Sequence, residues 1–258
     1  ARFLTGGRDS DAVSLRVRCG VPEAAPTFPV CTFKRVFDTT PAQEVLTLAE
    51  LVACFRRFEL KPQLHAKIER EVGRIDRALE AALGGQRIGE RVAAIAMAGE
   101  GAADPPHAMR ARAEQLRLDA RREAKRDLRL WSPVLYKEGW PERGSEGVTH
   151  VSCLVLDYDQ SIRVPDAIAP FEQHFLLWHS TWSHSPSHPK LRVILPLAIA
   201  VPAREWDKVW GWAYQKSAGD IDRSMSGTAT TYALPATWAE DAPREAGSHA
   251  APFLDPRA

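Results

Sequence analysis

Val151-Ser-Cys-Leu-Val-Leu-Asp-Tyr-Asp159 is the most informative stretch of this 258-residue chain. Residues 151–156 form a short apolar run typical of a buried strand, and Asp157 and Asp159 follow it directly. Because strand side chains alternate between two faces, both carboxylates are expected on the same face. Two carboxylates that close repel each other unless a cation neutralises them, and such oxygen ligands suit Mg²⁺ or Mn²⁺. The stretch suggests a divalent-ion site, although Asp-x-Asp also occurs in plain turns.

Short apolar runs separated by turn residues surround this stretch and predict a sheet with interspersed helices. Further strands are predicted at residues 30–37, 175–180, 191–197 and 228–234. A capping box of Thr47 and Glu50 begins one helix. Another helix carries Trp206 and Trp210 at helical spacing, which places both in the core, and ends near Gly219. Together these elements predict a mixed α/β fold of the α+β type.

The region between residues 61 and 130 is predicted to be helical. Apolar residues recur at helical spacing until Gly84 ends the pattern, at Leu64, Ile68, Val72, Ile75 and Leu79. A second helical stretch, residues 107–130, holds eight Lys or Arg and four Asp or Glu, a charge of 8 − 4 = +4 with His neutral. Two interpretations stay open for it: contact with nucleic-acid phosphates, or a solvated helix face held by ion pairs.

Composition bounds the class of protein. The chain is 45% hydrophobic, enough for a sizeable core, and its formal charge of +1 means that any nucleic-acid binding needs a local basic face. The four cysteines lack zinc-site spacing, which favours reduced thiols, and no apolar run approaches the ~18 residues of a membrane helix. We therefore expect a cytoplasmic protein with no membrane partner. Residues 1–29 lack periodicity and are expected to form a flexible arm, and the start without Met suggests a piece of a longer protein.

Polar residues gather in the turn between two of the predicted strands. Ser183 and His184 follow the strand at residues 175–180, and the next strand carries Arg192 and is preceded by Lys190. Hydroxyl, imidazole and cationic groups around one strand-turn-strand unit suit a triphosphate. The alternative is that His184 merely decorates a turn. Arg192 argues against it, because a guanidinium inside an otherwise apolar strand needs an anionic partner.

A further acidic pair, Asp220 and Asp222, lies between the Trp-bearing helix and the last predicted strand. Asp222 is the favoured third carboxylate of a metal site, with Asp220 as a surface charge at the helix end. Which of the two is the ligand stays open at this point.

In this order, the motifs resemble those of the archaeo-eukaryotic primase (AEP) superfamily, and within it the bacterial, plasmid and phage primase-polymerase (PrimPol) branch. The pieces that carry the resemblance are Leu154-Val-Leu-Asp157-Tyr-Asp159, Thr181-Trp-Ser183-His184, Lys190-Leu-Arg192-Val-Ile-Leu-Pro196, and Asp222 with Tyr232-Ala-Leu-Pro235. The resemblance implies an AEP catalytic core with a modified RNA-recognition-motif-like mixed sheet at residues 131–258. It also implies an N-terminal αβ module at residues 30–60 and a partly basic helical insertion at residues 61–130.

The resemblance also implies a site and a reaction. Asp157, Asp159 and Asp222 would hold two Mg²⁺ or Mn²⁺ ions, and His184 matches the motif histidine that contacts the phosphates of the incoming nucleotide. Ser183, Lys190 and Arg192 would be further nucleotide contacts. The reaction would be template-directed nucleotidyl transfer from NTP or dNTP.

Partners of such an enzyme would be a single-stranded DNA template and a primer, with a helicase or other replication domain outside this chain. Candidate DNA contacts are Lys34 and Arg35, expected on the first strand, and Arg121 and Arg122 of the basic helix.

Two rival interpretations remain. A Mn²⁺-dependent glycosyltransferase explains Asp157 and Asp159 but leaves the residues around His184 and Arg192 without a role. A non-catalytic single-stranded nucleic-acid-binding module explains the fold, but leaves clustered carboxylates without a neutralising cation.

Overall fold

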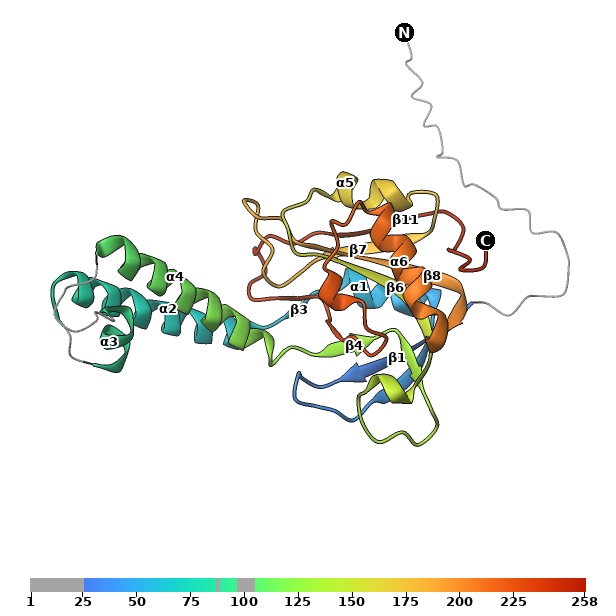
Figure 1. The fold of residues 1–258 in the computed structure, drawn as a ribbon, viewed down its shortest axis with the longest axis horizontal. Coiled ribbons are helices and arrows are strands. Elements are labelled where there is room, and N and C mark those ends of the chain that lie inside the picture. The colour runs from blue at the N-terminus through green and yellow to red at the C-terminus, as the bar shows by residue number, and fades with distance from the viewer. Residues whose placement is uncertain (1–25, 87–88, 97–104) are drawn as a thin grey trace, which may run out of the picture.

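The computed structural model describes residues 26–86, 89–96 and 105–258, and its fold is mixed α/β, as the sequence predicts. Two antiparallel sheets form a body, and helices α2, α3 and α4 extend from it as an arm (Figure 1). A flexible arm is predicted for residues 1–29, and residues 1–25 of it lie outside the described residues. For Thr27 to Pro29 the prediction is wrong, because these residues belong to strand β1.

Within the described residues, the larger sheet has five strands in the order β11-β7-β8-β6-β5. Their bounds are β5 Val134–Tyr136, β6 Val148–Tyr158, β7 Leu176–Ser180, β8 Leu191–Pro202 and β11 Ala246–His249. Every neighbouring pair is antiparallel. The strands predicted at residues 151–156, 175–180 and 191–197 are confirmed as its centre, where apolar side chains on both faces are buried.

The two faces of this sheet are covered differently. Leu154 of β6 and Val193 of β8 pack in one cluster with helices α5, Val164–Ile168, and α6, Trp206–Lys216. Trp206 and Trp210 of α6 are buried in that cluster, which confirms their predicted core position. The opposite face packs on helix α1, Leu48–Arg56, and on the second sheet.

The second sheet joins distant parts of the chain in the order β2-β1-β4-β9, counted over the described residues. Its strands are β1 Thr27–Phe33, β2 Ala42–Thr47, β4 Leu130–Ser132 and β9 Tyr232–Ala233. Strand β2 is almost wholly exposed and lacks a buried alternation, which is why the sequence did not predict it. Its pairing with Thr27 to Pro29 extends β1 at its start. The capping box that begins α1 is confirmed, with Thr47 Oγ1 accepting from the Glu50 N–H.

Two predicted strands are shorter in the structure because turns interrupt them. The predicted strand at residues 30–37 ends at Phe33, because the Asp38 carboxylate accepts the Lys34 N–H and closes a turn. The predicted strand at residues 228–234 is reduced to β9, because the Thr230 N–H and hydroxyl both bond the Gly227 carbonyl in a preceding turn.

The arm consists of α2, Pro62–Leu83, α3, Glu90–Ala96, and α4, Pro106–Lys125. Helix α2 ends at Gly84 as predicted, and Ile75, Ile95 and Ala113 form a small core between the helices. At the base of the arm, Trp182 packs with Leu128 in a cluster that ties the helices to the body. Strand β3, Glu59–Leu60, pairs in parallel with β10, Ala236–Thr237, at the same junction.

Four single turns of 3₁₀ helix complete the described elements: η1 Ser145–Gly147, η2 Ala169–Phe171, η3 Ala203–Glu205 and η4 Arg223–Met225. No helix among the described residues is both long and apolar enough for a membrane span. Cys31, Cys54 and Cys153 are free thiols, and burial raises the pKa of Cys31 and of Cys153 to about 12.

Candidate active site

The site lies where one face of the larger sheet changes from apolar to charged. On β6 the face runs through Cys153 and Val155 to Asp157, and on β8 it runs through Ile194 to Arg192. Because β6 and β8 pair antiparallel, with Asp157 opposite Arg192, both charged residues come to the same end of the sheet.

Asp157 and Arg192 form a buried ion pair. The Arg192 Nη2 to Asp157 Oδ2 distance is 2.6 Å, and only 10% of the Asp157 side chain and 7% of the Arg192 side chain are exposed. Arg192 also donates from Nη1 to the Ala233 carbonyl at 2.8 Å, and its guanidinium lies 4.9 Å from the centre of the Tyr232 ring. Two buried atoms of the pair, Asp157 Oδ1 and Arg192 Nε, have no hydrogen-bond partner among the described residues. The pair therefore keeps unused hydrogen-bonding capacity.

A second ion pair continues the first. Lys190 Nζ lies 3.1 Å from Asp159 Oδ1, with 20% and 58% of the two side chains exposed. Lys190 and Arg192 are two residues apart on the chain, as are Asp159 and Asp157, so the two pairs stack along one face. The two aspartates that the sequence placed on one face are each held there by a cation.

His184 and Ser183 lie in the turn between β7 and β8, beside this second pair. The buried His184 ring accepts the Lys190 N–H at Nδ1, at 3.2 Å, so Nε2 is the ring nitrogen that can donate a hydrogen bond. That nitrogen lies 3.9 Å from Glu245 Oε1. The Ser183 hydroxyl is buried and has no partner among the described residues. The turn thus carries two donors that are not fully used.

Asp222 lies next to Asp157 and Asp220 does not. The Asp222 N–H donates to the Asp157 carbonyl at 2.9 Å, while the Asp222 carboxylate accepts the Ser224 N–H at 2.9 Å and caps η4. Asp220 is exposed. The described side chain near its charge is Tyr158, which packs on the sheet face covered by α5 and α6. Burial, and after it the Asp220 charge, raises the pKa of Tyr158. Over residues 26–86, 89–96 and 105–258, no three acidic, imidazole or thiol groups gather as a metal site, so the three carboxylates are not assembled here.

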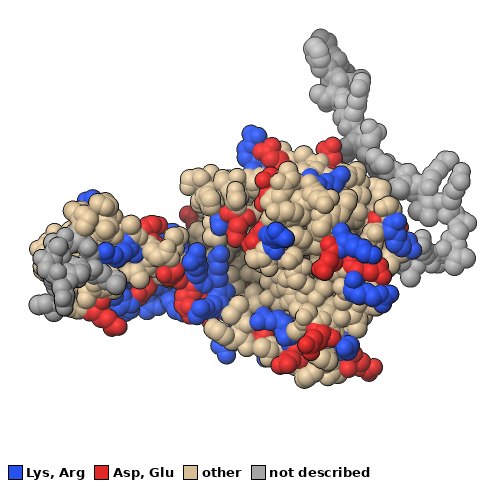
Figure 2. Space-filling model, in the orientation of Figure 1, with Lys and Arg blue, Asp and Glu red and all other residues tan. Residues whose placement is uncertain are grey.

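A cavity of about 270 Å³ opens beside Arg192 at the junction of body and arm. Arg122, Lys125 and Arg126 of the α4 end line it opposite Thr181 and Trp182. On the face seen in Figure 2, Lys and Arg side chains gather where the arm meets the body, next to a hollow. Of the predicted DNA contacts, Arg122 thus comes to the site, whereas Arg121 is exposed on the helix and does not line the cavity.

The prediction that Lys34 and Arg35 lie on the first strand is wrong, because both follow β1 in the turn closed by Asp38. They are exposed, and the same turn is joined to the end of α4 by the Val36 N–H, which donates to the Arg126 carbonyl at 3.1 Å. The turn therefore borders the cavity, where Val36 is part of the wall.

Two residues of the site were missed in the sequence. Lys125 faces the two ion pairs from the end of α4, and only the packing of the arm brings it there. His179 of β7 lies opposite Arg192, stacks on Phe55 and lines the cavity. Burial, with the Arg192 charge, lowers the pKa of His179 to about 3, although a bond to the Ser180 carbonyl opposes the shift. Alternation along the strand at residues 175–180 puts His179 on the same face as Leu177, and the register with β8 then places that face beside Arg192.

Known proteins provide little guidance for this chain. No protein-family model matches it, and no curated protein sequence matches it. Among solved structures, it is similar to the AEP domain of the primase-polymerase (PrimPol) of cyanophage S-2L, with 11% sequence identity and a TM-score of 0.37. The match covers 54% of this chain and 71% of the phage domain.

Proposed function

We propose that this chain is the catalytic domain of a DNA primase-polymerase, which joins nucleotides to a primer on a single-stranded DNA template. The observation that carries the proposal is the buried Asp157 and Arg192 pair at the end of the sheet, with one carboxylate oxygen unpartnered. A buried ion pair contributes little net stability, because desolvation of both charges offsets their attraction. Such a pair beside a cationic cavity is better explained by a ligand that carries both kinds of charge.

A metal-bound nucleoside triphosphate is a ligand of that kind. Its cation needs carboxylates and its phosphates need cations, and the two ion pairs supply both. In this proposal, Lys190 and Arg192 are free to bind phosphate oxygens once their carboxylates take up another cation. Before the substrate binds, the two ion pairs thus keep these carboxylates and cations in position.

The carboxylates at this end of the sheet are of the ligand type that suits a divalent cation, although the described residues do not gather three of them around one point. Asp157 offers Oδ1, which has no partner among the described residues, and Asp159 is exposed and forms an ion pair with Lys190. Asp222 donates its backbone N–H to the Asp157 carbonyl. Mg²⁺ keeps several waters and phosphate oxygens as ligands, so two or three carboxylates are enough. When bound, two such ions supply activation of the attacking hydroxyl and stabilisation of the departing pyrophosphate.

The remaining residues bind and position the substrate. His184 presents Nε2–H from a ring that the Lys190 backbone holds in place, which suits a phosphate oxygen. Ser183 contributes a hydroxyl, and Arg122 supplies charge from the arm for the template or primer backbone. A helicase or other replication domain elsewhere in the full protein would complete the machinery.

Primer extension with labelled nucleotides tests the proposal. We expect synthesis on primed single-stranded DNA in Mg²⁺ or Mn²⁺, and a loss of at least about a thousandfold in a variant carrying Asp157→Asn and Asp159→Asn. Asp207→Asn is the matched control, because Asp207 is exposed on α6, which covers the other face of the sheet. Full synthesis by the double variant would refute the proposal, and transfer from a nucleotide-sugar would favour a glycosyltransferase.

A further inference from the structure

The end of helix α4 brings positive charge into the cavity beside the two ion pairs. Arg122, Lys125 and Arg126 line the cavity from the arm, and Arg192 lines it from the body. Arg122 and Arg126 are exposed, and each is paired with an acidic residue three positions earlier on the helix. Lys125 differs from both.

Lys125 is a half-buried cation that has no partner among the described residues. Its ammonium makes no hydrogen bond or ion pair with them, although it lies within electrostatic reach of Asp159, Lys190 and Asp157. Burial lowers the pKa of Lys125 below its ordinary value, and Lys190 and Arg192 oppose its charge while the two aspartates support it. Desolvating an unpaired ammonium costs free energy, which an anion bound in the cavity would offset.

The favourable position of cations at a helix C-terminus does not account for Lys125. That effect acts on exposed side chains of the last turn and is worth about 0.3–1 kcal/mol. It explains Arg122 and Arg126, which remain in solvent. A lysine placed against two other cations, over carboxylates that already have partners, gains little from the helix and needs an anion of its own.

The charge balance points to a polyanion. Lys125, Lys190 and Arg192 carry three positive charges against the two negative charges of Asp157 and Asp159, an excess of +1 before any metal ion is added. Asp222, counted as a third carboxylate, would bring this sum to zero, and each divalent ion then adds two positive charges. A single phosphate diester carries one negative charge and offsets only half the charge of one such ion, whereas the chain of phosphates of a nucleotide carries enough.

We propose that Lys125 is a positioning residue that binds the polyphosphate of the incoming nucleotide, so that the helical arm contributes directly to the nucleotide site. This inference rests on the proposed function. It makes the arm part of the active site, because α4 delivers an ammonium that no described carboxylate pairs. Removal of the ammonium is expected to weaken nucleotide binding and to leave the fold intact.

The test is calorimetric titration of the whole chain with MgATP, MgdATP and inorganic tripolyphosphate, without DNA. We expect Lys125→Gln to raise the dissociation constant for all three by about tenfold or more, and Lys125→Arg to retain most of the affinity. Lys208→Gln is the matched control, because Lys208 is exposed on α6 over the opposite face, and it should bind as wild type. In primer extension, Lys125→Gln should raise the nucleotide KM far more than it lowers kcat, with a melting temperature of the free chain that is no lower than wild type.

Three outcomes would overturn the inference. Wild-type affinity in Lys125→Gln, while the wild-type chain binds nucleotide and extends primers, would refute the role of Lys125 and leave the proposed function standing. A loss restricted to single-stranded DNA binding would assign Lys125 to the template instead. A wild-type chain that binds none of the three probes and does not extend primers would refute both proposals together.

Discussion

The arm and the body of this molecule place their charges in opposite ways. In the arm, charged side chains pair along or between helices in solvent: in the Arg122 and Asp119 pair, 71% and 53% of the side chains are exposed. In the body, the Asp157 and Arg192 pair is almost entirely buried. Exposed pairs contribute about 0–1 kcal/mol each, whereas a buried pair must overcome the desolvation of both charges. The difference teaches that the arm's pairs are solvated, whereas the body's pair is buried at a cost that the proposed function explains by a ligand.

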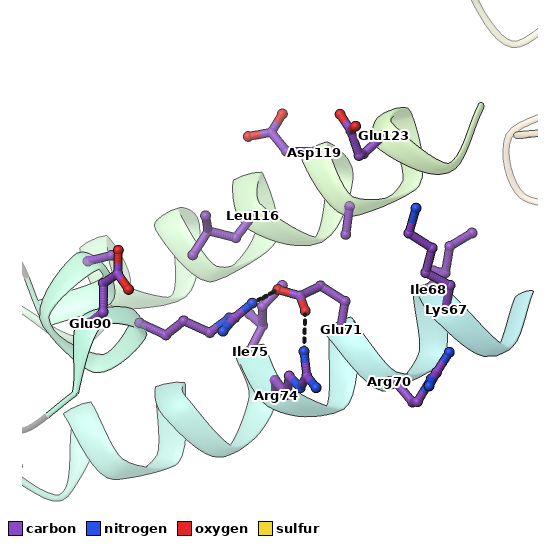
Figure 3. Close-up of a pocket in the computed structure, with 13 residues that line it drawn as sticks. Lys67, Ile68, Arg70, Glu71, Arg74, Ile75, Glu90, Leu116, Asp119 and Glu123 are labelled. Carbon is purple, nitrogen blue, oxygen red and sulfur yellow. Dashed lines mark hydrogen bonds and ion pairs between the residues drawn. The ribbon is translucent and has the colours of Figure 1, made fainter. Parts of the chain in front are cut away.

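The cavities of the two regions show the same contrast. A groove of about 720 Å³ runs between α2 and α4 in the arm, with both signs of charge on its rim. There Glu71 accepts hydrogen bonds from Arg91 and pairs with Arg74, so its carboxylate offsets charge on this rim (Figure 3). The cavity at the junction of body and arm is lined by four cations and no carboxylate, although Arg122 and Arg126 pair with Asp119 and Glu123 outside it. Lys125 is the cation of this lining that has no partner among the described residues.

The largest effect on stability is expected from breaking the buried pair on one side. Arg192→Met leaves the Asp157 carboxylate buried without its cation, which should lower the free energy of unfolding by about 3–5 kcal/mol. Urea denaturation at pH 7 measures this change. An effect below about 1 kcal/mol would mean that Asp157 is well solvated, and would remove the contrast between the two regions.

The next effect is a pH dependence that arises from His179. Its folded pKa of about 3 lies below the ordinary 6.5, so the unfolded chain binds a proton between these values that the folded chain excludes. The contribution of the neutral His179 to the free energy of unfolding should therefore be fully present above about pH 6.5. It should decrease as the pH falls toward 3, by up to about 1.4 kcal/mol per pH unit for this one proton. Denaturation between pH 7 and 4.5 measures the slope. His179→Phe should make this slope shallower. An equal slope in the variant would show that His179 is not the group whose protonation the folded chain prevents.

A smaller effect is expected at the turn. His184→Gln removes the imidazole while it keeps an amide donor, so the apparent nucleotide KM should rise about tenfold. Steady-state primer extension gives both constants. His150→Gln is a matched control, because His150 lies at the far end of β6 from Asp157. Unchanged nucleotide kinetics in His184→Gln would remove His184 from the site.

The smallest effect is expected in the arm. Arg74→Ala breaks an exposed pair with Glu71 and should change the free energy of unfolding by no more than about 0.5 kcal/mol. Thermal or urea denaturation measures it beside Arg192→Met. A loss as large as that of Arg192→Met would contradict the division between structural and functional charges.

Local signals predicted the parts of the fold that depend on neighbours in sequence. The run at residues 151–156, the capping box of Thr47 and Glu50, and the end of α2 at Gly84 were visible because a few adjacent residues determine them. Strands β2, β4, β5 and β11 were not predicted, because pairing with distant partners defines them. The three central strands of the five-stranded sheet could be anticipated, whereas its edges and half of the second sheet could not.

The site was predictable to the same extent. Arg192 in an apolar strand required an anion, but only the β6 and β8 register shows that in this structure the anion is Asp157. The sequence already favoured Asp222 over Asp220, and the backbone hydrogen bond from Asp222 to Asp157 is consistent with that preference. Lys125 could not be identified at all, since its place depends on how the arm packs on the body. The assignment of metal-ligand and nucleotide-binding roles to these residues stays a prediction.

The most direct test of the central claim is to replace the buried pair by apolar residues of similar size, with Asp157→Leu and Arg192→Met combined. If the pair is retained for a ligand, the double variant should recover most of the stability that Arg192→Met alone loses, and should have no metal-dependent primer extension. Urea denaturation and primer extension on the same preparation give both results. A double variant as unstable as the single one, or one that still extends primers, would contradict the account.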